Sequence, residues 1–198
     1  MNMNLVYLYL FSPLHTGGTT QEGNLLGIAR ESHTDLPYIP SSSIRGRLRA
    51  LLENDKPLQH RLFGTELTEG GAGGDKLEQG AIWIGDGSIL WLPVPSLSHG
   101  VVWISCPLLL RRWGRFQGIA NSIPTPYATT LNHNKSVYLK DAILKTDVLK
   151  EWDKPDPFLS QDMKAQGIEK ALVLPDQHCA TVIQMSLWRQ VKIKLDQH

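Results

Sequence analysis

Three consecutive serines, Ser41, Ser42 and Ser43, stand directly before an apolar repeat that also carries Arg45 and Arg49. Backbone amides at a helix start, with hydroxyls beside them, can hold an anion, and the helix dipole adds partial positive charge there. The two arginines are four residues apart, so they share one helix face and can reach one phosphate or the next along a chain. The pattern indicates a phosphate site, although composition alone favours a plain capped helix with solvated arginines.

His15 is a second candidate because it lies between an expected strand and the glycines Gly17 and Gly18. An imidazole on a glycine loop can act as a general base or donate to a phosphate, but a lone histidine is more often structural or merely exposed. No second histidine, cysteine or carboxylate is spaced with it as metal ligands are. The sequence therefore predicts no catalytic residue, no metal and no cofactor.

The clearest expected element is a helix from residue 41 to about residue 54, ending before Pro57. One face of it is apolar, through Ile44, Leu48, Leu51 and Leu52. Further helices are expected over residues 108–116, ending near Gly118, and over residues 163–172. Strands are expected at residues 5–10, 81–84, 89–94, 101–106, 137–144 and 191–195. This mixed order lacks a regular βαβ rhythm and indicates the α+β class.

Three tryptophans lie inside these strand-like runs: Trp83, Trp91 and Trp103. An indole can stack on a nucleobase. A tryptophan in an apolar strand is nevertheless expected in the core, so all three are predicted to be buried.

The chain has 198 residues and a formal net charge of +1, so an overall basic balance does not point to nucleic acid. Residues 87–140 contain no acid, which can build one positive surface unless folding scatters the charges. The arginines and lysines of this stretch are Arg111, Arg112, Arg115, Lys135 and Lys140. No apolar run is long enough to span a membrane. Two cysteines, Cys106 and Cys179, suit a reducing cytoplasm.

Four segments carry a family likeness: LHTGG at 14–18, IARE at 28–31, LPYIPSSSIRGRLR at 36–49 and LFG at 62–64. Their order resembles the RAMP superfamily of CRISPR proteins, and most of all the Cmr-type backbone subunit of type III effector complexes. That family shows a Pro-x-Ile-Pro-Gly-Ser-Ser-x-Lys-Gly-x-x-Arg stretch opening a helix. Residues 81–84, 90–96 and 102–107 resemble the strands that follow in the family.

The resemblance implies a ferredoxin-like, RNA-recognition-type α+β fold with insertions, in a single domain over residues 1–198. A mobile loop is expected at about 65–80 and an irregular insertion at about 118–162. Ser41, Ser42 and Ser43 would act as donors to RNA, with Arg45 in the lysine position and Arg49 in the arginine position of the pattern. His15 is included among the RNA-binding residues.

The implied function is that of a scaffold subunit in a cytoplasmic ribonucleoprotein for antiviral defence. Such a subunit holds guide RNA by its phosphates, because every guide differs in sequence. The expected partners are CRISPR guide RNA, target RNA, and other backbone and large subunits of the complex, with no membrane. Two alternatives remain: a guide-processing ribonuclease with His15 as general base, and a protein-docking domain without RNA contact.

The sequence departs from the family pattern at three places. Ser41 replaces a glycine, and Leu25 occupies the position where many members carry an aspartate for metal-dependent cleavage of target RNA. The nearest carboxylates outside the motif, Glu22 and Asp35, do not fit the pattern, so we expect a subunit that does not cleave. The sequence ends at His198, and the fold is therefore expected to lack the C-terminal part of the family.

Overall fold

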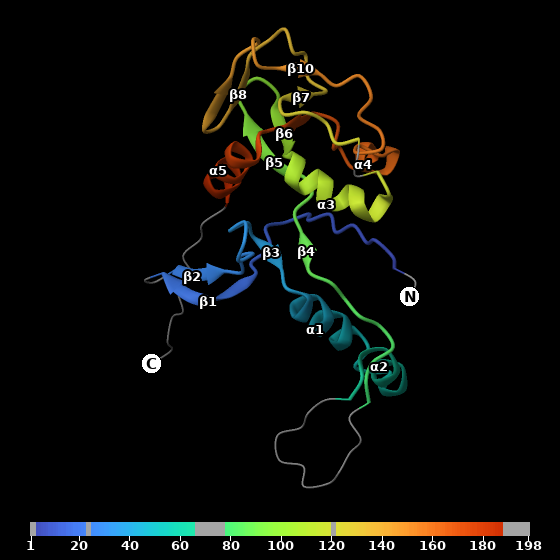
Figure 1. The fold of residues 1–198 in the computed structure, drawn as a ribbon. Coiled ribbons are helices and arrows are strands. Elements are labelled where there is room, and N and C mark those ends of the chain that lie inside the picture. Colours follow the sequence, from blue (N-terminus) through green and yellow to red (C-terminus); the bar gives the residue numbers. More distant parts are fainter. Residues whose placement is uncertain (1–2, 23–24, 66–77, 120–121, 188–198) are drawn as a thin grey trace. The chain divides into compact units, whose positions relative to one another are not determined.

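The computed structural model describes residues 3–22, 25–65, 78–119 and 122–187. Its contacts divide the chain into two compact units. Unit 1 comprises Met1–Pro13, Glu31–Leu36 and Ile89–His198, and unit 2 comprises Leu14–Arg30 and Pro37–Ser88. Each unit is described by itself, and the single domain over residues 1–198 stays a prediction. Figure 1 labels the elements of both units.

Unit 1 is built on a mixed sheet, which has seven strands within the described residues, in the order β10-β7-β11-β6-β5-β8-β9 (Figure 1). The strands are β5 (Leu92–Ser96), β6 (Gly100–Ser105), β7 (Ala128–Thr129), β8 (Val137–Leu139), β9 (Ala142–Leu144), β10 (Lys150–Glu151) and β11 (Ala171–Val173). Antiparallel hairpins join β5 to β6 and β8 to β9, whereas β11 is parallel to β6 and β10 is parallel to β7. This mixture explains why the sequence shows no regular βαβ rhythm.

Three helices flank this sheet in the described part of unit 1: α3 (Pro107–Gln117), α4 (Gln161–Ala165) and α5 (Asp176–Ser186). Helix α3 begins with a proline, whose missing N–H costs nothing there, and ends at Gly118 in the left-handed conformation, with φ 72°. The carboxylate of Asp176 accepts a hydrogen bond from the Leu108 amide at 2.9 Å, so the first residue of α5 also caps α3.

Both faces of the sheet are covered by apolar side chains, as the alternation along each strand requires. Ile104 of β6 and Leu172 of β11 pack with α3 and α5 on one face, where both side chains are fully buried. On the other face, Ala171 packs with Leu159 and Met163, and Trp103 packs partly against them. Unit 1 therefore has apolar clusters on both faces of its sheet.

Within the described residues, unit 2 contains two short antiparallel strand pairs and two helices. Strands β1 (Gly17–Glu22) and β2 (Leu25–Ile28) pair antiparallel, as do β3 (Tyr38–Ile39) and β4 (Gly87–Ser88). Helix α1 spans Ser41–Leu51 and α2 spans Lys56–Phe63. The Asp55 carboxylate caps α2 by accepting from the Leu58 amide at 3.1 Å. Helix α1 buries none of its residues, and α2 buries Gln59 and Phe63.

The predicted α+β class is confirmed, together with the helices that begin near Ser41 and after Cys106. The strands expected at 89–94 and 101–106 correspond to β5 and β6, with shifted bounds. The run expected at 137–144 divides into the hairpin strands β8 and β9. The strand expected at 191–195 lies outside the described residues, as do residues 66–77 of the expected loop.

Several predictions of secondary structure are wrong. Residues 5–10 and 81–84 form no strand, because an apolar run specifies a face but not a pairing partner. Trp83, expected in the core, is 84% exposed. The helix expected at 163–172 is confined to α4 and gives way to β11, and residues 118–162, expected to be irregular, contain β7 to β10. Helices α2 and α5 were not predicted.

Candidate nucleic-acid interface

The first turn of α1 carries the serines singled out by the sequence, but their side chains do not cap it. The N-cap residue is Pro40, which has no side-chain hydrogen bond to the helix. The Asp86 carboxylate instead accepts from the Ser41 amide at 2.7 Å, and the Pro40 carbonyl accepts from the Ser43 amide at 2.9 Å. Two of the three amides expected to meet a phosphate therefore already have acceptors. The Ser42 and Ser43 side chains remain exposed.

Ser41 takes the place of the family's glycine without backbone strain. It is the first residue of α1 and lies in a right-handed helix. The described non-glycine residues with positive φ are Asp35 and Tyr127, not Ser41. The conformational freedom of a glycine is therefore not needed at this position.

Arg45 and Arg49 lie on one face of α1, as predicted, and both reach the end of α2. The Arg45 guanidinium donates to the Phe63 carbonyl, and Arg49 donates to the Gly64 carbonyl at 2.9 Å. Cationic groups are favourable there because the last carbonyls of a helix lack intrahelical donors and carry partial negative charge. Arg45 is exposed and its guanidinium has further N–H donors, so it can also face a phosphate.

The junction after α2 requires a glycine at the LFG motif. Gly64 has φ 77°, and a Cβ atom on it would lie 2.4 Å from the Glu78 carbonyl oxygen. A Cβ on Gly80 would likewise lie 2.4 Å from the Leu62 carbonyl oxygen. The backbone around Gly64 therefore packs closely against the backbone around Gly80. This packing fixes the positions of the two carbonyls to which Arg45 and Arg49 donate.

His15 lies just before β1, and its side chain is exposed. Its neighbour Thr16 accepts a backbone hydrogen bond from Ala29 at 2.9 Å, which joins this segment to the end of β2. Within the described residues, no hydrogen bond joins His15 to the serines or arginines of α1. The proposed role of His15 in RNA binding stays a prediction.

Leu25 begins β2 and is the backbone partner of Glu22 at the end of β1. Elsewhere, in unit 1, the Glu31 carboxylate is held by Arg112 through N–O distances of 2.5 and 3.0 Å. Asp35 accepts from the Gln184 side chain through its backbone carbonyl, at 2.7 Å. Among the described residues, no group of three or more histidine, cysteine or acidic side chains is arranged to hold a metal ion.

Two residues of unit 2 were not retained as candidates from the sequence. Asp86 places a carboxylate at the helix start, across 45 positions of sequence, where local patterns give no signal. Trp83 presents an exposed indole on which a base can stack. The sequence offered only a weak indication that Trp83 is exposed. Residues 81–84 are largely apolar and lack the alternation of a half-buried strand.

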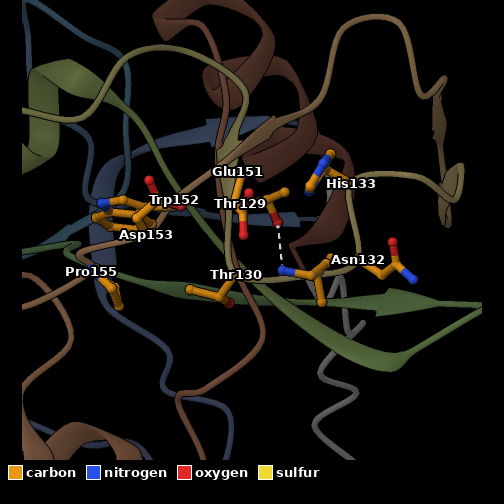
Figure 2. Close-up of a pocket in the computed structure, with 9 residues that line it drawn as sticks. Thr129, Thr130, Asn132, His133, Glu151, Trp152, Asp153 and Pro155 are labelled. Atoms are coloured by element: carbon orange, nitrogen blue, oxygen red, sulfur yellow. Dashed lines mark hydrogen bonds between the residues drawn. The ribbon is translucent and has the colours of Figure 1, made fainter.

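A hollow in unit 1 has a volume of about 500 Å³ and is lined by polar side chains together with Leu131, Trp152 and Pro155 (Figure 2). Its charged groups include Glu151 and Asp153, and the Thr129 hydroxyl is engaged by the Leu131 amide at 3.1 Å. Two carboxylates repel a phosphate, so this hollow is poorly suited to an RNA backbone.

Comparison with known proteins gives the family directly. The family model of the RAMP superfamily matches residues 7–198, so the chain belongs to the RAMP superfamily. It is 33% identical over 120 residues to the CRISPR system Cmr endoribonuclease Cmr4 of Pyrococcus furiosus. That alignment covers 58% of this chain and 39% of the relative, so the match spans well under half of the relative's length.

Solved structures show the same fold. The crystal structure of oligomeric Cmr4 from Pyrococcus furiosus matches with a TM-score of 0.69 at 22% identity, covering 90% of this chain and 71% of that one. A chain in the cryo-EM structure of the type III-B Cmr-beta complex bound to cognate target RNA matches with a TM-score of 0.55 at 17% identity. That match covers 86% of this chain and 65% of the other. Within the described residues, no helix is long and apolar enough to cross a membrane.

Proposed function

We propose that this protein is a scaffold subunit of a type III CRISPR ribonucleoprotein and holds guide RNA by its phosphates at the start of α1. The observation that carries this proposal is the exposed first half of α1. There Ser42, Ser43 and Arg45 face solvent, and the first turn contains no acidic residue. A helix start with hydroxyls and a guanidinium offers donors to any phosphate, whatever the base attached to it.

The two arginines have a double task in this proposal. Their hydrogen bonds to the end of α2 fix the guanidinium groups in place before RNA arrives. A donor that is already ordered loses less side-chain entropy on binding. Trp83, in the same unit, supplies an exposed aromatic face for a base without reading its identity.

Asp86 opposes this binding at the same helix end. Its carboxylate lies against the Ser41 amide and satisfies one of the unpaired donors of the helix. A phosphate that approaches the first turn therefore meets a negative charge beside the arginines. Because these opposite charges partly cancel, the affinity of one subunit for RNA is moderate. This suits a scaffold that repeats along a guide.

The proposed partners are CRISPR guide RNA, target RNA, and other backbone and large subunits of the effector complex, in antiviral defence. The relative named as a Cmr protein, and the Cmr-beta chain solved with cognate target RNA, support these partners. A cytoplasmic location belongs to the same proposal. Cys106 and Cys179, both buried as free thiols, support a reducing compartment.

The test is a salt titration of RNA binding by the full chain. Replacing Arg45 and Arg49 with alanine should lower the slope of log K against log salt by roughly 0.7 for each phosphate that the protein no longer neutralises. The variants Arg45→Lys and Arg49→Lys keep the charge but lose the planar fork, so they separate phosphate attraction from the clamp on α2. An unchanged slope in a folded alanine variant would contradict the assignment.

A guide-processing ribonuclease is the competing function, and the name of the Cmr4 relative gives it support. With His15 as general base, it would cleave repeat RNA in the presence of EDTA. Such chemistry also needs an acid or a cation near the leaving oxygen. Cleavage that persists in EDTA and is lost in His15→Ala would establish this function in place of the scaffold.

A third function, protein docking without RNA contact, predicts RNA binding that α1 variants leave unchanged.

We also propose that this subunit does not cleave target RNA, because the side chain of Leu25 has no oxygen to hold Mg²⁺. The measurement maps cuts at single-nucleotide resolution in an assembled complex with Mg²⁺. A cut opposite this subunit that disappears in Glu22→Ala would contradict the proposal and assign the metal to Glu22. A cut that survives combined alanine substitution of Glu22, Asp35 and His15 would come from a neighbouring subunit.

A further inference from the structure

We propose that the outward face of α3 is a second contact for single-stranded RNA, made by Arg111, Arg115, Phe116 and His33. It lies in unit 1, whereas the α1 site lies in unit 2. The inference rests on the proposed function, since it assumes that the chain meets RNA. The contacts of α3 carry the argument.

Helix α3 is amphipathic, with a deeply buried inner face. Leu109, Leu110 and Trp113 are each no more than 8% exposed. With 3.6 residues per turn, Arg111 and Arg115 stack on the opposite side of this helix, one turn apart. Both are exposed. Both guanidinium groups can therefore meet phosphates of one strand.

The two exposed arginines of the outward face have no acidic residue on their own helix. The first turn of α3 contains no acidic residue, and residues 87–140 contain none at all. Ion pairs in unit 1 include those of Glu31 with Arg112 and His33, and of Asp156 with Lys164. Neither Arg111 nor Arg115 takes part in them. A partner rich in negative charge complements such a face.

The turn at residues 31–36 adds a histidine to this face. Glu31 forms a bidentate pair with Arg112 and accepts from the Thr34 hydroxyl at 2.6 Å, which fixes the turn on α3. His33 then lies with its Nε2 atom 3.4 Å from the Arg112 Nη2 atom, while its side chain is 69% exposed. Arg112 is thus a positioning residue, because its guanidinium is already paired with the Glu31 carboxylate. His33 is the side chain that this turn presents to a ligand.

Phe116 provides the feature that favours RNA over an acidic protein. Its side chain is 51% exposed, lies one turn after Arg112 and directly follows Arg115 in the sequence. An exposed aromatic ring next to guanidinium groups is the arrangement on which bases of a single strand stack while the phosphates meet the cations. An acidic peptide would use the arginines but would gain little from the ring.

The experiment measures binding of single-stranded RNA by the full chain over a range of salt. The double variant Arg111→Gln/Arg115→Gln should lower the slope of log K against log salt by about 1.4. Its matched control, Lys140→Gln/Lys145→Gln, removes the same charge from exposed residues of unit 1 and should leave the slope within error of the parent. The variant Phe116→Ala should weaken binding about tenfold with an unchanged slope, as stacking predicts.

The outcomes separate this inference from the function on which it rests. If Arg45→Ala/Arg49→Ala lowers the slope and the α3 double variant does not, the inference is overturned and the proposed function stands. If the parent chain shows no salt-dependent RNA binding, both fail. Equal reductions in the double variant and the lysine control would indicate a general charge effect and also overturn the inference. A double variant that binds RNA normally but no longer binds another subunit would assign the face to protein docking. Circular dichroism and melting of each variant show that it is folded.

Discussion

In unit 1 apolar side chains cover both faces of a seven-stranded sheet within the described residues, whereas in unit 2 helix α1 buries no residue. The ends of the unit 2 helices are held by polar contacts: Asp86 at the start of α1, and Arg45 and Arg49 at the end of α2. Gln59 adds a hydrogen bond of 2.8 Å from its side chain to the Arg49 carbonyl. The two units therefore owe their order to different forces.

The difference explains where an RNA contact can be built. A side chain that fills a core cannot also face a ligand, so a unit stabilised by burial presents ligands only with residues outside its core. In unit 2 the side chains that join the helices include two charged ones, Arg45, which is exposed, and Arg49, which is partly buried. They can therefore stabilise the unit and attract phosphate together. Substitutions that separate burial from polar contact test this comparison.

The largest expected effect is a loss of core packing in unit 1. Leu172→Ala removes a fully buried side chain from the middle of the sheet and should destabilise the fold by about 2–5 kcal/mol. The control is Leu97→Ala, because Leu97 is 91% exposed and the same atoms are removed from solvent-facing surface. Urea unfolding measures both. Similar destabilisation by the two variants would show that unit 1 does not depend on its core.

Unit 2 should respond most to a change at its glycine junction. Gly64→Ala forces a Cβ against the Glu78 carbonyl oxygen at positive φ and should cost about 1–3 kcal/mol or more. Gly46→Ala should act in the opposite direction, stabilising by about 0.5–1 kcal/mol, because this helical site is open and glycine is a poor helix former. Thermal melting of the two alanine variants gives the signs. A stabilised Gly64→Ala would refute the tight junction.

Asp86→Asn should separate stability from RNA binding within unit 2. Loss of the charged acceptor at the Ser41 amide should destabilise α1 by about 0.5–1 kcal/mol. Removal of the negative charge should at the same time tighten RNA binding. Melting and a binding titration measure the two effects on one sample. Weaker RNA binding in a folded Asp86→Asn protein would count against the phosphate site at this helix start.

The sequence was most informative where helix boundaries are set by local chemistry. Pro107 at the start and Gly118 at the end define α3 almost completely. The same reasoning fails at Pro57, which suggests the end of a helix although it lies in the first turn of α2. Residues 5–10 have the pattern of a strand, but their backbone forms no strand in the described structure. Pairing depends on partners that no local pattern specifies.

The candidate site was predictable only in part, for the same reason. The serines and the spacing of Arg45 and Arg49 could be recognised on one helix, and the family pattern gave them a role. The acceptors of those arginines lie 18 and 15 residues further along the chain, and Asp86 lies 45 residues beyond Ser41. These contacts depend on the fold of unit 2, so the sequence alone could not show that the arginines also have a structural task.

The smallest expected effect concerns pH and unit 1. Burial lowers the pKa of His99 below its ordinary value of 6.5, and the positive charges of Lys170 and Lys135 lower it further. Because the folded state resists protonation, the stability linked to His99 is fully present above pH 6.5 and is lost as the pH falls below it. His99→Gln should make the fall in melting temperature between about pH 7.5 and about pH 5.5 slightly shallower. A steeper fall in the variant would contradict this direction.

The central claim, that unit 2 takes RNA by its backbone at the start of α1, is tested most directly by hydrogen exchange of the full chain. Mass spectrometry would follow peptides covering Ser41–Leu51 with and without saturating single-stranded RNA, using two RNAs of unrelated sequence. The account predicts slower exchange in α1 with both RNAs, to the same extent, and no change around the acidic hollow of Figure 2. Exchange in α1 that RNA leaves unchanged, or that only one sequence slows, would contradict it.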